Sequence, residues 1–327
     1  MYGPVNRCLS WSVFLIVMSW GAGGYGATTL TSPPAKERAA AISVIQAAVL
    51  GVVEGLTEYL PVSSTGHLLV TQRVMGIGNS NSNSSRERES VKAAADAYAI
   101  CIQGGAILAV LGLYGRRFKQ MLKGVVGRDP AGLKMAINMA AAFGPAAIIG
   151  LLLEGRIKEH LFGVWPVVWA WFVGGIGILV LGWWQGRQSE RPRHTKPLEE
   201  LTWRLALLIG LAQCVAMWPG VSRSLVTIVG GVMVGLTLLA AVEFSFLLGV
   251  VTLTAAAFYD AIKFGTIMLD SFHALPLVVG LVFAFLSAVV AVKWMVNYLG
   301  RHGLGVFGYY RVALALLVAL CYANKLI

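Results

Sequence analysis

The stretch EGLTEYLPVSSTGH occupies residues 54–67 and places two acids, a proline and several hydroxyl residues inside an otherwise apolar region. The apolar pieces on either side of Pro61 lie within residues 41–60 and 62–76. As helices they are each about 15 residues long, or about 22 Å, against a membrane core of about 30 Å. We therefore interpret them as two half-helices that form a re-entrant hairpin, broken at the proline.

A second broken segment has the same character. Apolar residues 204–218 and 222–236 flank Pro219-Gly220. GVVE at 51–54 is echoed by GLAQ at 210–213, and PVSS at 61–64 by PGVSR at 219–223 with one residue inserted. This similarity predicts two hairpins that face each other across a pseudo-two-fold axis.

The rest of the chain is dominated by longer apolar segments, at about 93–115, 133–153, 165–184, 238–261, 273–296 and 306–324. Of the 327 residues, 57% are hydrophobic and 13% are charged, whereas about 25% are charged in soluble domains. A soluble globular fold is excluded. We predict an all-α polytopic membrane protein with about six spanning helices, forming a single domain over 41–327 with repeats at about 41–184 and 204–327.

The first 40 residues differ from the remainder. Arg7 precedes an apolar stretch over 9–20 and a polar run over 28–38. This pattern is typical of a signal sequence or a signal anchor followed by a polar linker, and it leaves cleavage open.

The net charge of +11 indicates topology rather than nucleic-acid binding, because the basic residues collect between apolar segments. One cluster comprises Arg116, Arg117, Lys119, Lys123, Arg128 and Lys134, and another Arg187, Arg191, Arg193, Lys196 and Arg204. Both loops are predicted to be cytoplasmic, which leaves loops 154–163 and 78–90 outside. The two hairpins then enter from opposite sides, as in an inverted repeat.

Glu54 and Glu58 are four residues apart and therefore share one face of a helix. An ionised group at membrane depth costs from about 3 to more than 10 kcal/mol, so such acids pair, bind a cation or hold a proton. The alternative is a water-exposed helix end with solvated charges.

Hydroxyl and imidazole groups follow directly, at Ser63, Ser64, Thr65 and His67. The hydroxyls could cap the half-helix after the break. Near two carboxylates, His67 has the properties needed to activate a nucleophile or transfer a proton, although a structural histidine is the alternative.

The opposing tip carries Ser222, Arg223, Ser224 and Thr227. An arginine at the start of a half-helix combines a five-donor charged group with free backbone N–H groups, which suits phosphate. A structural salt bridge from Arg223 to Glu54 or Glu58 is the alternative.

Acids beside a phosphate site usually imply a divalent cation between them. We predict Mg²⁺ or Ca²⁺ held by Glu54 and Glu58, and phosphoryl transfer as the chemistry. A secondary transporter or lipid translocase remains the rival, because broken helices and intramembrane acids also serve ion coupling.

Three motifs carry a resemblance to a known family: the stretch 54–67, WPGVSRS at 218–224 and EFSFLL at 243–248. Together with IQGG at 102–105 and Tyr310-Arg311, they resemble bacterial undecaprenyl-diphosphatases of the BacA type, the bacitracin resistance proteins. The resemblance runs from about residue 41 to the C-terminus. It implies a divalent-cation-dependent enzyme that removes the terminal phosphate of undecaprenyl diphosphate, which recycles the cell-wall lipid carrier and confers bacitracin resistance.

The resemblance also implies roles for individual residues. The family's catalytic positions match Glu54, Glu58, Ser64, His67, Ser222, Arg223 and Thr227, while Ser63, Thr65 and Ser224 complete the phosphate-binding set. Leu225 departs from the small residue that is usual there. The nucleophile is left open between Ser64, His67 and water.

The implied setting is the bacterial inner membrane, with the site open toward the periplasm. The expected partners are a polyprenyl diphosphate lipid and membrane lipids, with no nucleic acid, and a homo-oligomer is left open.

Overall fold

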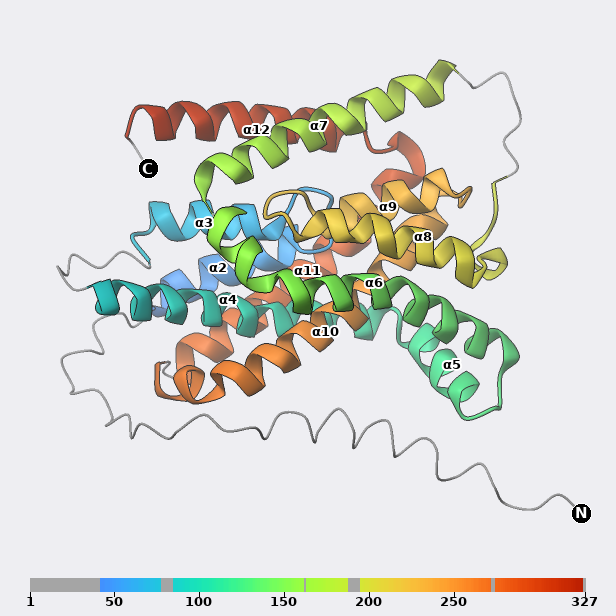
Figure 1. Ribbon diagram of the computed structural model, residues 1–327, viewed down its shortest axis with the longest axis horizontal. Coiled ribbons are helices and arrows are strands. Elements are labelled where there is room, and N and C mark those ends of the chain that lie inside the picture. The colour runs from blue at the N-terminus through green and yellow to red at the C-terminus, as the bar shows by residue number, and fades with distance from the viewer. Residues whose placement is uncertain (1–41, 78–84, 162, 188–194, 272–273, 326–327) are drawn as a thin grey trace, which may run out of the picture. The chain divides into compact units, whose positions relative to one another are not determined.

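In the part of the chain that the structure describes, six long apolar helices form the frame of the protein (Figure 1). They are α4 (Ser85–Leu113), α6 (Pro130–Leu161), α7 (Val164–Arg187), α10 (Leu238–Ser271), α11 (Ala274–His302) and α12 (Gly305–Ala323). Each contains a segment long and apolar enough to cross a membrane. The prediction of an all-α, multi-pass membrane protein is thereby confirmed.

The computed structural model describes residues 42–77, 85–161, 163–187, 195–271 and 274–325. The leader and linker predicted over 1–40 lie outside the described residues. So do Arg191 and Arg193 of the second basic loop and residues 78–84 of the loop predicted at 78–90.

Four short helices interrupt this frame at the two predicted breaks. They are α2 (Val44–Thr57), α3 (Ser64–Val74), α8 (Trp203–Gln213), continued by the 3-10 helix η3 (Cys214–Met217), and α9 (Arg223–Met233). Helix α2 starts in a capping box formed by Ser43 and Gln46 and ends before Pro61. Helix α2 contacts α3 and helix α8 contacts α9, so each pair forms a helical hairpin.

The two hairpins share an unusual backbone feature. Ser63 and Ser222 each precede the second helix of a hairpin, and their φ angles of 73° and 74° lie in the left-handed region, which non-glycine residues rarely adopt. The residues are 222 − 63 = 159 positions apart, the same separation as between Glu54 and Gln213. Aligned on Ser63 and Ser222, the two tips therefore match without an inserted residue. The one-residue insertion arises only when Pro61 is aligned with Pro219.

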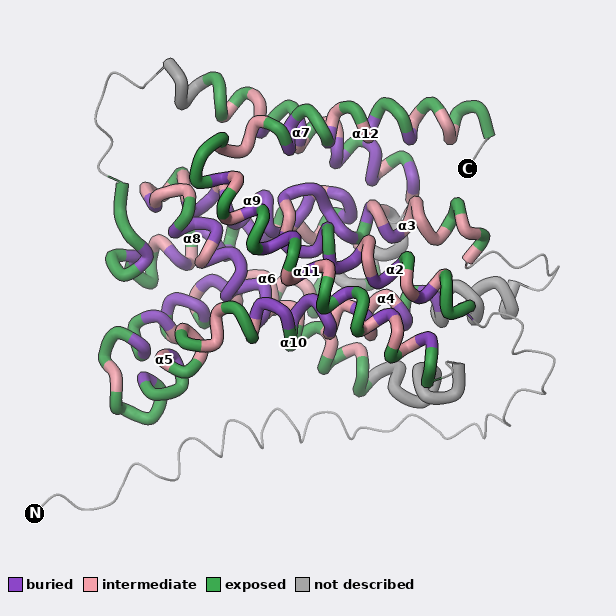
Figure 2. Tube along the Cα trace, turned by 180° about the vertical axis from the view of Figure 1, so that it is seen from behind, coloured by how far each residue is buried: buried purple, intermediate pink, exposed green. Residues whose placement is uncertain are grey.

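The element order repeats as well, because each hairpin is followed by three long helices. The halves exchange partners: α2 packs on α11 of the second half, and α8 packs on α6 of the first. Helices α7 and α12 lie side by side in both views, and α4 contacts α10 (Figure 1, Figure 2).

Glycines allow α2 to pack closely on α11, and α8 on α6. A Cβ on Gly51 of α2 would overlap the carbonyl oxygen of Gly280 on α11, and one on Gly210 of α8 would overlap that of Ala142 on α6. Any larger residue would push the hairpin away from its supporting helix, and hence displace its tip.

The basic loops contain structure that the sequence reading missed. Helix α5 (Gly115–Val125) lies in the first loop and packs on α6, while the 3-10 helix η2 (Leu198–Glu200) lies in the second. Figure 2 shows buried residues gathered on the hairpins and on the inward faces of the long helices. Large apolar side chains such as Ile45 and Leu152 are exposed, as expected for a surface that meets lipid.

Candidate active site

The tips of the two hairpins contact each other through side chains. The Ser224 hydroxyl, on α9, donates a hydrogen bond of 2.7 Å to the carbonyl of Leu60 in the first tip. The Arg223 Nη2 atom lies 3.1 Å from Glu58 Oε1. The structure therefore brings together the acids of one hairpin and the arginine of the other, residues 165 positions apart.

Both acids are buried, with 1% of Glu54 and 7% of Glu58 exposed. Glu58 is fully engaged, since one carboxylate oxygen pairs with Arg223 and the other accepts from the Ser64 hydroxyl. Glu54 lies one turn away, and its Oε2 atom has no hydrogen-bond partner among the described residues. The structure thus contains the salt bridge that is the alternative role for Arg223, and its partner is Glu58.

Three further groups hold the Arg223 guanidinium in position. Its Nη1 donates to the carbonyl of Ser245 at 3.3 Å, and its carbon lies 5.7 Å from the centre of the Tyr59 ring. Gly249 of α10 gives it room, because a Cβ there would overlap the guanidinium nitrogens. The buried Nε atom has no partner among the described residues, so its N–H is available to a ligand.

The start of helix α3 presents free donors, whereas the start of α9 is capped. Ser64 is the first residue of α3, and the Ser63 side chain makes no capping hydrogen bond. In α9, the Ser222 hydroxyl accepts from the Leu225 N–H at 3.3 Å. First-turn N–H groups bind anions readily. The α3 terminus, which Ser64 and Glu58 connect to Arg223, is therefore suited to a phosphate.

His67 lies at the same tip but not against Ser64. Its Nδ1 is 2.6 Å from the Ser63 carbonyl and its Nε2 is 2.7 Å from the Tyr310 hydroxyl, and the two rings stack with centroids 5.8 Å apart. A carbonyl only accepts, so Nδ1 carries the hydrogen and Nε2 accepts from Tyr310. No hydrogen bond joins His67 to Ser64 among the described residues, and the Ser64 hydroxyl donates to Glu58 instead.

The remaining predicted phosphate ligands differ in their surroundings. Thr65 is exposed, and the Ser222 hydroxyl lies 3.0 Å from that of Ser224. Thr227 is fully buried, and its hydroxyl bonds the Arg223 carbonyl at 2.9 Å and the Ser245 hydroxyl at 2.7 Å. Ser224 and Thr227 therefore help to hold the second tip in place.

The sequence reading did not assign three residues at this junction: Ser245, Tyr310 and Arg311. Ser245 supports Arg223 and Thr227, and Tyr310 holds His67. Arg311 is completely buried and donates to carbonyls in both tips. The motifs at 243–248 and at 310–311 contain all three, but sequence alone does not show that these helices reach the tips.

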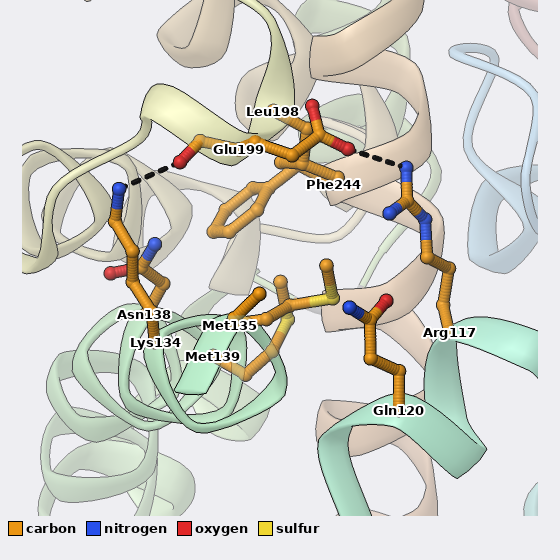
Figure 3. Close-up of a pocket in the computed structure, with 10 residues that line it drawn as sticks. Arg117, Gln120, Lys134, Met135, Asn138, Met139, Leu198, Glu199 and Phe244 are labelled. Atoms are coloured by element: carbon orange, nitrogen blue, oxygen red, sulfur yellow. Dashed lines mark hydrogen bonds and ion pairs between the residues drawn. The ribbon is translucent and has the colours of Figure 1, made fainter. Parts of the chain in front are cut away.

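A separate polar cluster joins the two basic loops (Figure 3). It surrounds a cavity of about 40 Å³. Arg117 of α5 donates to Glu199 at 2.9 Å and to Glu243 at 2.6 Å, and Lys134 donates to the Glu199 carbonyl at 2.6 Å. The hydrogen bond to Glu243 raises the pKa of Arg117. None of the predicted site residues lines this cavity, so it is a junction between loops.

No group of three or more His, Cys, Asp or Glu side chains able to hold a metal occurs in the part of the chain that the structure describes. Of the two carboxylates predicted as ligands, Glu54 lies in the last turn of α2 and Glu58 is the residue that caps this helix, with its N–H bonded to the Glu54 carbonyl.

The chain is similar to known proteins over most of its length. A family model described as bacitracin resistance protein BacA matches residues 47–317. The chain is similar to the undecaprenyl-diphosphatase of Sorangium cellulosum, with 44% identity over 83% of this chain and 84% of that protein. It is also similar to undecaprenyl-diphosphatase 2 of Rhodospirillum rubrum, with 43% identity over 85% and 94%, and to the undecaprenyl-diphosphatase of Maridesulfovibrio salexigens, with 42% identity over 84% and 97%. Both the family match and these identities span most of the chain, and the chain therefore belongs to the BacA family of bacitracin resistance proteins.

Proposed function

We propose that this protein is an undecaprenyl-diphosphate phosphatase, which hydrolyses undecaprenyl diphosphate to undecaprenyl phosphate and inorganic phosphate. The observation that carries the proposal is the Ser64–Glu58–Arg223 arrangement, in which a hydroxyl, a carboxylate and a guanidinium meet where the two hairpins touch. The names of the similar proteins give the substrate. Removal of the terminal phosphate recycles the cell-wall lipid carrier and underlies bacitracin resistance.

In the proposed mechanism the terminal phosphate sits between the start of α3 and Arg223. The first-turn N–H groups and the free Arg223 Nε donate to its oxygens. Arg223 exchanges part of its pairing with Glu58 for the phosphate. That exchange frees the Glu58 carboxylate to act on the neighbouring hydroxyl.

Ser64 is the nucleophile favoured by this geometry. Its hydroxyl already donates to Glu58, which takes the proton as Oγ attacks the terminal phosphorus. The bond from that phosphorus to the bridging oxygen breaks, and undecaprenyl phosphate leaves with the electron pair. Water then cleaves the phosphoserine, releasing phosphate and restoring the hydroxyl. Direct attack by water, with Glu58 as base, is the alternative.

A divalent cation, Mg²⁺ or Ca²⁺, fits the residues present. The unpartnered Oε2 of buried Glu54 is an atom that a cation or a proton would satisfy. Mg²⁺ in particular is usually held by one or two carboxylates together with substrate phosphates and water. When bound, the cation would offset phosphate charge beside Glu54 and Glu58.

We further propose that both hairpins are re-entrant and enter from opposite sides of the inner membrane, with the site open toward the periplasm. Three candidate spans separate the hairpins, and an odd number of crossings reverses the side of entry. The basic residues of α5 and of the loop around Lys196 support a cytoplasmic position for both loops.

Phosphate release by purified protein in detergent tests this function. We expect the protein to release phosphate from undecaprenyl diphosphate. A chelator should abolish this release, and added Mg²⁺ or Ca²⁺ should restore it. A transporter or translocase would show no release without a membrane to cross, and that result would overturn the assignment.

A further inference from the structure

The guanidinium of Arg311 bonds both hairpins at once. This residue lies on α12 and is fully buried. Its Nη1 donates to the Pro61 carbonyl at 3.2 Å, and its Nη2 donates to the carbonyls of Gly220 and Ala170, each at 2.9 Å. One planar group therefore connects the first tip, the second tip and helix α7.

The two tip carbonyls occupy corresponding positions. Pro61 and Gly220 are 220 − 61 = 159 residues apart, which is the separation of Ser63 and Ser222. Each carbonyl lies two residues before a serine of positive φ. Arg311 thus bonds the same backbone atom in both halves of the repeat.

The reactive side chains follow these carbonyls at equal distance along the chain. Ser64 is three residues after Pro61, and Arg223 is three residues after Gly220. The intervening serines are held in a strained backbone conformation. Fixing the two carbonyls relative to each other therefore fixes Ser64 relative to Arg223.

We propose that Arg311 is the positioning residue that sets the spacing between the nucleophile side and the phosphate-binding side of the site. The proposal rests on the phosphatase function above. A helix break inside a membrane needs donors for its freed carbonyls, and Arg311 supplies them to both breaks from a single rigid group. A change in its position changes both tips together.

Helix α7 offers a way to move this guanidinium without removing its charge. A Cβ on Gly174 would overlap Arg311 Nη2, whereas a Cβ on Gly177 of the same helix meets nothing within 4 Å. Gly174→Ala and Gly177→Ala are thus a matched pair that differs in contact with Arg311. Arg311→Lys is a second probe, because a lysine cannot reach three carbonyls in this planar geometry.

We expect Gly174→Ala and Arg311→Lys to lower kcat about 100-fold, the loss that misplacement of reacting groups by about 1 Å produces. KM should change less than about threefold, because Arg311 donates to backbone carbonyls and is not itself among the groups proposed to bind the phosphate. Gly177→Ala should match the wild type. If kcat per folded molecule is unchanged in both probes and only thermal stability falls, Arg311 is merely structural and the proposal fails.

A distance measurement separates this inference from the proposed activity. Spin labels at Val74→Cys and Met233→Cys, in a protein lacking native cysteines, report the exposed far ends of α3 and α9. Gly174→Ala should shift or broaden the distance distribution, and Gly177→Ala should not. An unchanged distribution overturns the positioning role. Absence of phosphate release by the wild type would instead overturn the function and leave the distance result standing.

Discussion

At the scale of single residues, the site depends on how the Arg223 guanidinium is seated. It reaches Glu58 and the Ser245 carbonyl with separate nitrogens, and it rests in the space left by Gly249. We expect Arg223→Lys to lose most activity although the charge remains, because one ammonium cannot replace the planar group. Gly249→Ala should lower kcat at least 10-fold by displacing the same group.

The control for this prediction is Gly144→Ala, where an added Cβ meets nothing within 4 Å. Steady-state phosphate release by the three variants is the measurement. Wild-type turnover in both Arg223→Lys and Gly249→Ala would mean that Arg223 serves only as the structural partner of Glu58.

Ser64 is expected to carry phosphate during the reaction. Its hydroxyl donates to Glu58, so attack by this oxygen would leave a phosphoserine that survives acid, unlike a phosphohistidine. With substrate labelled in the terminal phosphate, an acid quench should leave label on the wild type and none on Ser64→Ala. His67→Ala should keep the label. Substantial turnover by Ser64→Ala without any labelled protein would instead favour attack by water.

The two acids are expected to respond differently to metal. Glu54 has a free buried oxygen, whereas both oxygens of Glu58 are engaged. Glu54→Gln should therefore raise the cation concentration needed for half-maximal rate, by about 10-fold or more. Glu58→Gln should mainly lower the rate at saturating cation, because it removes the base for Ser64. Identical metal titrations for Glu54→Gln and the wild type would refute the ligand role of Glu54.

At the scale of elements, one carboxylate connects η2 to α5. The backbone N–H of Glu199 and the Arg117 guanidinium lower the pKa of Glu199 below its ordinary value of 4.5. A carboxylate whose pKa is lowered by folding stabilises the protein at pH values above its ordinary pKa. This stabilisation is lost as the pH falls through the pKa that the carboxylate has in the folded state. It amounts to less than about 1 kcal/mol, because the carboxylate is 56% exposed.

Glu199→Gln should accordingly lower the Tm of the purified protein slightly at pH 7, and the difference from wild type should vanish once the pH falls below the lowered pKa of Glu199 in the folded protein. Glu200→Gln, at the exposed neighbouring residue, is the control and should have no effect at either pH. A Tm difference that persists at low pH would show that packing of η2, rather than the ion pair, is what the substitution disturbs.

At the scale of the whole molecule, the side on which each hairpin begins and ends is testable. Exposed residues lie near all four hairpin ends, namely Ile45, Val74, Trp203 and Met233. As single cysteines in intact cells, the first two should react with an impermeant reagent and the last two should not. Val126→Cys, in the basic loop after α5, serves as the cytoplasmic control. Opposite reactivity at the two ends of one hairpin would show that it crosses the membrane.

The sequence by itself determined that the chain is a helical membrane protein, and it determined which residues its candidate site contains. Segment length and hydropathy identified the six long helices, because a span must be apolar throughout and about 20 residues long. The breaks at Pro61 and Pro219 were equally visible, since backbone chemistry there is local. The motifs alone assign Glu54, Glu58, Ser64 and Arg223 to the two tips.

The tertiary structure decided which of those groups touch. Glu58 bonds both Ser64 and Arg223, while His67 turns to Tyr310. Helix α5 was missed because its basic residues resemble a plain loop. Arg311 joins the tips from 250 residues beyond Pro61. Spacing along a chain fixes which residues share one helix face, but the contact of a residue with a distant helix depends on how all the helices pack. The contacts of Glu58 with Ser64 and Arg223, and the support of the tips by α12, are therefore properties of the fold.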